Sequence, residues 1–253
     1  MHILKAFVVA FSMYSKIPMP KVAWEEKNIR YAMCFFPFVG MVIGAMFYGW
    51  WMLCNYLQMG MLCRSAVAAV LPVLLTGGIH IDGFMDTMDA KSSYQSRERK
   101  LEILKDAHVG SFAVLSVVVY FLLEVAGFSE LHSKEAAGVA ALGYILSRTF
   151  SGFALVTMEG ARQDGLLYTF SSGAHKRIVR VVLVFIACLT VSAMFFIDIV
   201  RGALVLAGVL LVFFYYAIMS RKEFGGITGD LAGWFLTVCE LCILWMVVLG
   251  EYL

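Results

Sequence analysis

Charged residues are scarce in this sequence. Asp, Glu, Lys and Arg make up 15% of its 253 residues, hydrophobic residues make up 61%, and the mean hydropathy is +0.83. A soluble domain carries about 25% charged residues, so this composition excludes one. No segment alternates polar and apolar residues as an outer-membrane strand does. The apolar residues instead form windows near the ~20 residues that a helix needs to cross a bilayer. The sequence therefore predicts an all-α, polytopic transmembrane bundle that forms one domain over residues 1–253 and has the lipid bilayer as a partner.

The absence of several other sequence features narrows the range of possible functions. The net charge is +2 and no basic stripe interleaves with aromatic residues, which argues against nucleic acid as a partner. None of the six cysteines belongs to a CxxC pair that is backed by a second pair or by histidines, so we expect structural thiols. The first twenty residues contain no small-residue cleavage site and are expected to stay in the mature protein. The two halves lack the paired broken helices typical of an inverted-repeat transporter.

Hydropathy predicts seven spans, and residues 1–16 form either an eighth span or a helix that lies in the membrane interface. The predicted spans are residues 31–57, 64–81, 110–128, 135–157, 178–198, 203–219 and 231–250.

The positive charges predict sidedness. Residues 16–30, 91–105, 162–180 and 221–222 hold fifteen of the twenty Lys and Arg residues, and the loops that alternate with these four segments hold three. Because cytoplasmic loops are enriched in Lys and Arg, the four basic segments are expected to face the cytoplasm of a bacterium across its inner membrane.

The most unusual stretch is TGGIHIDGFMDTMDA, residues 76–90, which carries Asp82, Asp86 and Asp89. If these residues are helical, the spacings of four and three place the three carboxylates on one face. Like charges this close repel one another unless a cation lies between them. Oxygen ligands without cysteine favour Mg²⁺ or Mn²⁺ over zinc, and Mg²⁺ is often shared with substrate phosphates. The alternative is a helix end whose acids are simply solvated. His80 precedes the cluster as a candidate base, carboxylate-orienting group or phosphate contact, or as a histidine that only satisfies a helix end.

Two further motifs are expected on the same membrane face. KDAHVGSF contains Lys105 as a phosphate contact and Asp106 as a second metal ligand, or else both as plain interfacial anchors. GGITGDLAG places Gly225, Gly226, Thr228 and Gly229 before a helix, where free N–H groups can bind phosphate, with Asp230 beside them.

Arg148 lies within a predicted span, where an unpaired charge costs at least about 2.5 kcal/mol. Its partner is either a substrate phosphate or one of two intramembrane acids, Glu124 and Glu240. Carboxylates, a glycine loop and basic residues on one face predict metal-assisted phosphoryl transfer to or from a diphosphate-containing substrate.

The aspartate run resembles the signature of the cobalamin synthase family, the adenosylcobinamide-GDP ribazoletransferases, which carry TGG-x-H-x-DG-x-x-D-x-x-D. The resemblance continues in order through IPMP (17–20), FFPFVGMVIG (35–44), ILKDAHVGSF (103–112), the Ser147–Arg148 pair and GGITGDLAG. Ala90 departs from the family, which usually has glycine there.

The resemblance implies the last assembly step of the coenzyme B12 nucleotide loop. Adenosylcobinamide-GDP and α-ribazole, or its 5′-phosphate, would give adenosylcobalamin, or its 5′-phosphate, and GMP with Mg²⁺. It implies that Asp82, Asp86 and Asp89 hold Mg²⁺ on the diphosphate and that Asp106 and Asp230 add ligands or serve as base. His80, Lys105 and Arg148 would give polar support.

Three alternatives remain open at this point. They are an enzyme like a CDP-alcohol phosphotransferase, a polyprenyl transferase, and a cation-coupled transporter. The sequence also leaves open whether the chain forms a homo-oligomer.

Overall fold

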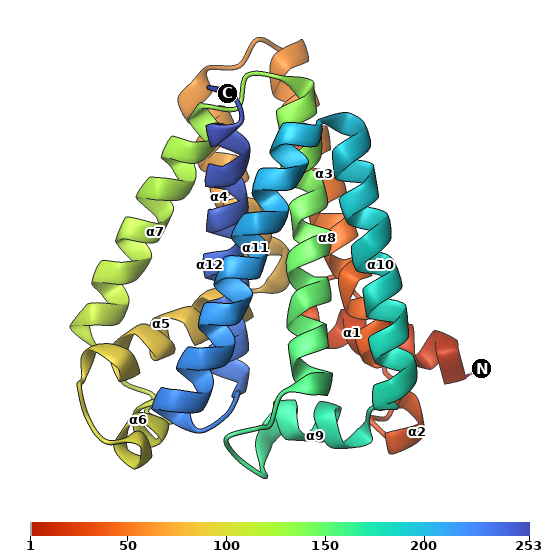
Figure 1. The fold of residues 1–253 in the computed structure, drawn as a ribbon, viewed down its shortest axis with the longest axis vertical. Helices are drawn as coiled ribbons and strands as arrows, with labels where there is room; N and C mark the ends of the chain where they lie inside the picture. Colours follow the sequence, from red (N-terminus) through yellow and green to blue (C-terminus); the bar gives the residue numbers. More distant parts are fainter. Residues whose placement is uncertain (1) are drawn as a thin grey trace.

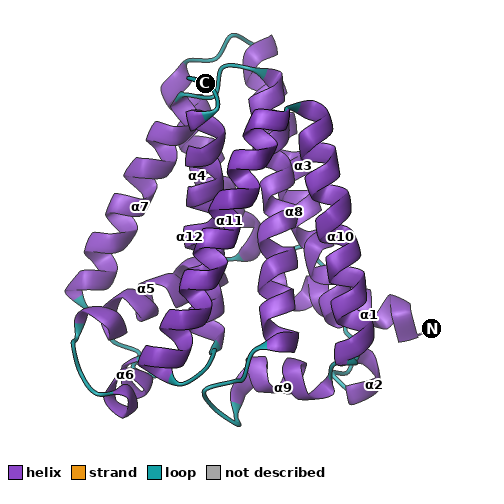
Figure 2. Cartoon of the chain, viewed as in Figure 1, coloured by secondary structure: helices purple, strands orange, loops and turns teal. Residues whose placement is uncertain are grey.

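The computed structural model describes residues 2–253, and within this range the chain is a helical bundle without strands (Figures 1 and 2). Six helices in the described range are long and apolar enough to cross a membrane. They are the helical run Glu26–Tyr56, which ends in α3 (Phe36–Tyr56), and α7 (Ser111–Ser129), α8 (Lys134–Thr157), α10 (Lys176–Ile197), α11 (Ile199–Met219) and α12 (Gly229–Leu249). The prediction of a multi-pass helical membrane protein is confirmed.

The remaining predicted span, 64–81, is wrong as a single straight helix. The structure has two helices there, α4 (Met61–Thr76) and α5 (Ile79–Ser92), which are bent by 97° relative to each other. Gly77 and Gly78 form the break, with φ of +70° and +81°, backbone conformations that glycine adopts without steric cost. The aspartates therefore lie on a separate helix that runs across the bundle, as the almost horizontal α5 in Figure 1 shows.

The N-terminal helix α1 (His2–Tyr14) has 13 residues. At 1.5 Å per residue it is about 20 Å long, too short for a hydrocarbon core of about 30 Å. Ala6, Val9 and Ala10 are buried against the bundle, whereas Ile3 and Leu4 are exposed. Of the two alternatives for this segment, its length favours a helix in the interface.

Helix α8 is the centre of the bundle. Of the residues in an apolar 18-residue stretch of α8, 72% are buried. The corresponding fraction in α10 is 22%, so most of the surface of α10 is left for contact with lipid. Helices α3, α10 and α12 pack directly on α8. The central helix thus supplies an inner wall for any cavity between its neighbours.

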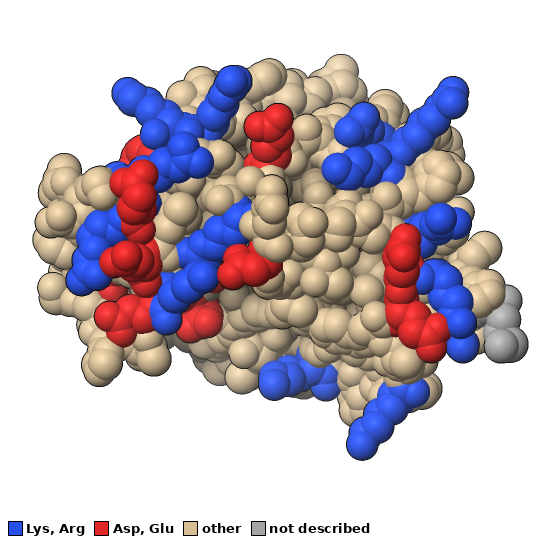
Figure 3. Space-filling view, turned by 90° about the horizontal axis from the view of Figure 1, so that it is seen from below, with Lys and Arg blue, Asp and Glu red and all other residues tan. Residues whose placement is uncertain are grey.

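The two ends of the bundle differ in charge. One end carries the short helices α2 (Glu26–Ile29), α6 (Arg97–Ile103) and α9 (Gly165–Gly173), together with the π-helical turn η2 (Ser220–Phe224). Figure 3, which views this end, shows Lys and Arg side chains gathered there with acidic ones. These elements contain or adjoin the four basic segments, so the structure places all four at one end of the molecule.

At the opposite end of the bundle, polar contacts of the C-terminal residues connect neighbouring helices. Glu251 accepts hydrogen bonds from the backbone N–H groups of His132 and Ser133 at 3.3 and 3.4 Å, and its other oxygen pairs with Arg201 at 2.7 Å. Arg201 also pairs with Asp198. This cluster joins the α7–α8 loop, the α10–α11 turn and the end of α12.

Candidate active site

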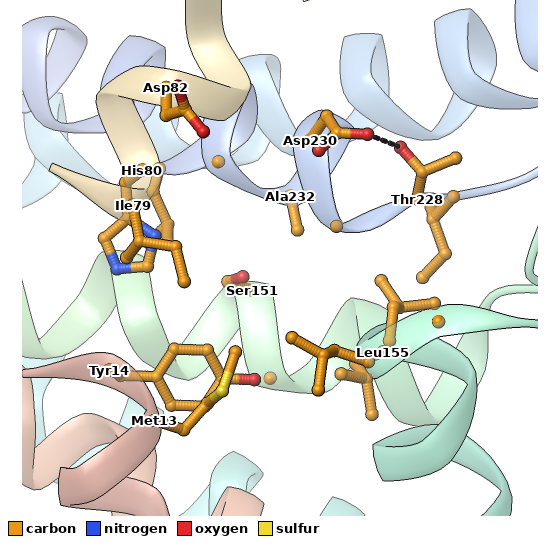
Figure 4. Close-up of a pocket in the computed structure, with 18 of the residues that line it drawn as sticks. Met13, Tyr14, Ile79, His80, Asp82, Ser151, Leu155, Thr228, Asp230 and Ala232 are labelled. Atoms are coloured by element: carbon orange, nitrogen blue, oxygen red, sulfur yellow. Dashed lines mark hydrogen bonds between the residues drawn. The ribbon is translucent and has the colours of Figure 1, made fainter. Parts of the chain in front are cut away.

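A cavity of about 350 Å³ opens among α1, α5, α8, α12 and residues 162–167 near the charged end. We call it the α5–α12 cavity. Figure 4 shows Asp82 and Asp230 on one side of it and Met13 and Tyr14 on the other, with Ser151 and Leu155 of α8 at its back. Carboxylates from α5 and α12, which are far apart in the sequence, thus face the same space.

The two acidic motifs meet because glycines allow α5 and α12 to cross closely. A Cβ atom on Gly83 would lie 2.8 Å from the Asp230 Cα, and one on Gly233 would lie 2.8 Å from the His80 carbonyl oxygen. Larger side chains would therefore separate the helices. The glycines that follow Asp82 and Asp230 in their motifs are what places the two carboxylates beside each other.

Thr228 fixes the start of α12. It is the N-cap residue, and its hydroxyl accepts a hydrogen bond from the Leu231 N–H at 3.2 Å and lies 3.5 Å from Asp230 Oδ2 (Figure 4). Thr228 and Gly229 both line the cavity, so the N-terminus of α12, which can bind phosphate, faces it.

Of the three aspartates on α5, Asp82 lines the cavity. Asp86 does not, although it lies within electrostatic reach of Asp82, Asp89 and Asp230. Asp89 points to the start of α7, where its two oxygens accept hydrogen bonds from the N–H groups of Gly110 and Ala113 at 2.6 and 2.8 Å. Asp89 therefore caps another helix in this structure, and the predicted group of three ligands does not converge on one point.

Cations reach the cavity from two loops. Lys105 lines it as predicted, and its Nζ lies 3.3 Å from Asp164 Oδ2, which also lines it. Arg162 lines it too and donates a hydrogen bond to the Leu101 carbonyl oxygen. In the sequence, Arg162 is recognisable only as one of the charges that indicate sidedness, since no local motif shows that its loop folds over the cavity.

Three other predicted site residues lie elsewhere. Asp106 accepts hydrogen bonds from the His108 backbone and lies 2.7 Å from the His108 ring, contacts that lower the pKa of Asp106. Gly225 and Gly226 line a separate depression on the other side of Ile227. Gly225 has φ of +78°, and Gly226 packs against residues 159–161, so the pair shapes the turn before α12 and is not placed to bind phosphate in the α5–α12 cavity.

Arg148 is not exposed to the cavity. Its side chain is 1% exposed and forms an ion pair with Glu240 of α12, while Ser147 accepts a second hydrogen bond from it at 2.9 Å. The structure thus provides one of the two predicted partners, the intramembrane acid. The predicted contact with substrate is not supported, because the guanidinium is enclosed between α8 and α12.

His80 lines the cavity from the first turn of α5. Within residues 2–253 its Nε2 atom is buried and has no hydrogen-bond partner. The imidazole ring is stacked with the ring of Tyr14, and the two ring centroids are 6.2 Å apart. Tyr14 was missed by the sequence analysis, which could not place the N-terminal helix against α5.

Comparison with known proteins decides the family. The family model described as cobalamin-5-phosphate synthase matches residues 6–248. The chain belongs to the cobalamin-5-phosphate synthase family. This membership confirms the resemblance in the motifs and decides against the CDP-alcohol phosphotransferase, polyprenyl transferase and transporter alternatives.

Several curated members of the cobalamin-5-phosphate synthase family are similar over nearly their full length. A protein of Lachnoclostridium phytofermentans named adenosylcobinamide-GDP ribazoletransferase is 44% identical over 98% of this chain and 95% of its own. Proteins of the same name from Clostridium perfringens (strain SM101) and Listeria monocytogenes are 34% and 30% identical, over 93% and 91% of this chain and 94% and 92% of theirs. No solved structure matches this chain.

The cavity of this cobalamin-5-phosphate synthase family member has the donor chemistry that Mg²⁺ prefers. Asp82 and Asp230 offer hard carboxylate oxygens from facing helices, and Asp86 is nearby. In the described part of the chain, no three Asp, Glu, His or Cys side chains are grouped closely enough to hold a metal alone. This arrangement fits an ion held by one or two carboxylates that completes its coordination with substrate phosphates and water.

Proposed function

We propose that this protein is an adenosylcobinamide-GDP ribazoletransferase of a bacterial inner membrane. It would transfer the adenosylcobinamide phosphate group from adenosylcobinamide-GDP to α-ribazole or α-ribazole 5′-phosphate and release GMP. Similarity to relatives of that name over nearly the whole chain supports the reaction. The observation that carries the proposal is the α5–α12 cavity, where Asp82, Asp230, Lys105 and Arg162 meet at one end of the bundle.

The transfer forms one P–O bond and breaks another. A ribose hydroxyl of the ribazole attacks the phosphate next to the corrinoid, the P–O–P bond breaks, and GMP leaves with the bridging oxygen. Because the 5′-oxygen is blocked in α-ribazole 5′-phosphate, a nucleophile common to both substrates must be another ribose hydroxyl. Such a reaction depends mainly on positioning and on stabilising the phosphate charge.

The residues that line the cavity would position the substrates and stabilise the phosphate charge. Asp82 and Asp230 would hold Mg²⁺, which neutralises charge on the diphosphate. Lys105 and Arg162 bind phosphate oxygens, and the N–H groups at the start of α12, near Thr228, face the same charge. His80 lines the same cavity and would orient the attacking hydroxyl or accept its proton, although burial lowers the pKa of His80 to about 3 and so makes the imidazole a weak base.

The sizes and polarities of the substrates explain why the reaction would take place at a membrane. The corrinoid is too large for a cavity of about 350 Å³, so only its diphosphate end enters while the macrocycle stays at the membrane surface. The charged end, with the cavity near it, would face the cytoplasm by the distribution of Lys and Arg.

The test is turnover by the purified protein in detergent or liposomes. Adenosylcobinamide-GDP is supplied with α-ribazole or with its 5′-phosphate, with Mg²⁺ or with EDTA, and GMP and the corrinoid product are measured by mass spectrometry. We expect stoichiometric GMP and cobalamin product only when Mg²⁺ is present. Absence of GMP release with both nucleophiles contradicts the function, and full turnover in EDTA contradicts the metal.

A further inference from the structure

The α5–α12 cavity has two chemically different walls. The wall at Asp82 and Asp230 is charged, and Lys105 and Arg162 adjoin it. The opposite wall is built by α1 and the start of α3, and Figure 4 shows Met13 and Tyr14 there. The reacting phosphates belong at the charged wall, which leaves the apolar wall without a role in the transfer itself.

The apolar wall is aromatic and preformed. The ring centroid of Tyr14 lies 4.3 Å from that of Phe36 and 6.0 Å from that of Phe170, which is fully buried. Met13 and Met33 line the same cavity as Tyr14 and Phe36. Aromatic rings with flanking methionines form a surface suited to a flat aromatic ligand.

Three substrate groups are flat aromatic bases attached to a ribose: the guanine of the GDP moiety, the adenine of the adenosyl ligand and the methylated benzimidazole of the ribazole. The adenine is bound to the corrinoid and stays outside the cavity with the macrocycle. Guanine carries several donors and acceptors on its edge, which must be matched when the base is buried. The uncharged polar residues that line the cavity include Tyr14, His80 and Ser151. A methylated benzimidazole has no donor and a single free ring nitrogen, so it fits this wall with little polar matching.

The size of the cavity agrees with a nucleoside. A volume of about 350 Å³ is at the lower end of the ~300–1,000 Å³ typical of small-molecule pockets. A nucleoside whose base lies on the apolar wall would direct its ribose toward Asp82, Asp230 and His80. The attacking hydroxyl would then reach the phosphate held at the charged wall.

We propose that the wall formed by Met13, Tyr14 and Phe36 binds the benzimidazole of the ribazole nucleophile, and that α1 is therefore part of the substrate site. This inference rests on the proposed function. It assigns the apolar wall of the cavity to the nucleophile, keeps the diphosphate at the charged wall and leaves the guanine and the corrinoid outside.

Steady-state kinetics with each substrate varied in turn tests the assignment. Tyr14→Ala is expected to raise the KM for α-ribazole roughly 10-fold or more, as loss of a base-stacking ring does, and to leave the KM for adenosylcobinamide-GDP within about twofold. Tyr14→Phe keeps the ring and should keep the low KM. Leu4→Ala, at an exposed position of the same helix, is the matched control and should leave both KM values unchanged.

A second measurement decides the question if Tyr14→Ala fails to fold. Met13→Cys is labelled with a maleimide, and the labelled peptide is quantified by mass spectrometry so that the six native cysteines do not interfere. We expect α-ribazole to slow labelling at position 13 and GMP to leave it unchanged.

The outcomes separate this inference from the proposed function. Slower labelling with GMP and not with α-ribazole, or a raised KM for adenosylcobinamide-GDP in Tyr14→Ala, overturns the assignment while the enzyme remains a ribazoletransferase. Absence of GMP release by the wild-type protein overturns the function itself.

Discussion

Asp82 and Asp89 lie two turns apart on α5 and have different surroundings. The carboxylate of Asp82 faces the α5–α12 cavity, whereas both oxygens of Asp89 accept hydrogen bonds from the start of α7. A carboxylate at a helix N-terminus is stabilised by the free N–H groups and by the helix dipole. We therefore expect these two residues of one sequence motif to contribute to different properties, Asp82 to turnover and Asp89 to stability.

We expect Asp82→Asn to lower kcat at least about 100-fold with unchanged thermal stability, the size of effect seen when one charge-stabilising group is lost. Asp89→Ala should lower the free energy of unfolding by about 1–3 kcal/mol, because two backbone donors lose their partner. GMP release and thermal unfolding in detergent measure the two effects. If Asp89→Ala is as stable as wild type but inactive, Asp89 acts as a metal ligand during turnover.

Arg148 and Glu240 form a pair that supports the bundle rather than the substrate. Removing one partner of a buried ion pair typically costs about 3–5 kcal/mol, because the other charge stays buried without compensation. Arg148→Met and Glu240→Leu should each destabilise the protein by this order, and the double variant Arg148→Met with Glu240→Leu should recover most of the loss. Thermal unfolding of the four proteins gives the coupling. A stable double variant with a strongly raised KM for adenosylcobinamide-GDP would instead show that Arg148 contributes to substrate binding.

At the scale of elements, the crossing of α5 and α12 controls the distance between Asp82 and Asp230. A Cβ atom on Gly83 would be 2.8 Å from both the Cα and the carbonyl oxygen of Asp230, so the two helices must move apart to accept it. Displacements of about 1 Å can reduce catalysis by about 100-fold when positioning provides most of the rate.

Gly83→Ala should therefore reduce kcat roughly 10- to 100-fold in a protein that still folds. The matched control is Gly49→Ala on α3, where an added Cβ meets no atom within 4 Å. Turnover and gel-filtration profiles of both variants check the prediction. Equal turnover in the two variants would show that the close crossing does not matter for catalysis.

The sequence predicts most helices and fails at α5 for a physical reason. Hydropathy averages over a window, so residues 64–81 look like one span although Gly77 and Gly78 break it. The spacing of Asp82, Asp86 and Asp89 correctly indicates a helix, but spacing alone does not show that the start of α7 meets Asp89. Tyr14 and Arg162 reach the cavity through tertiary packing, which leaves no periodic or local signal in the sequence.

At the scale of the whole molecule, charge divides the bundle into two unlike ends. Alternation of basic and non-basic loops predicted this division, and the structure gathers α2, α6, α9 and η2 at one end. The α5–α12 cavity opens near that end, so the proposed nucleotide-bearing substrate would approach from the compartment that this end faces. Sidedness thus has a functional consequence, since GMP would be released where it is available for reuse.

Single cysteines placed at the two ends test this orientation in intact cells. In a background without native cysteines, Tyr94→Cys between α5 and α6 should react with a membrane-impermeant maleimide only after permeabilisation, because the distribution of Lys and Arg predicts that this loop faces the cytoplasm. Gln58→Cys between α3 and α4 should react without it. Both positions are exposed, so the difference reports the membrane barrier rather than burial. The reverse labelling pattern would place the charged end and the α5–α12 cavity outside the cytoplasm. The cavity would then be separated from a cytoplasmic supply of nucleotide-activated substrate, which would contradict its proposed role as the active site.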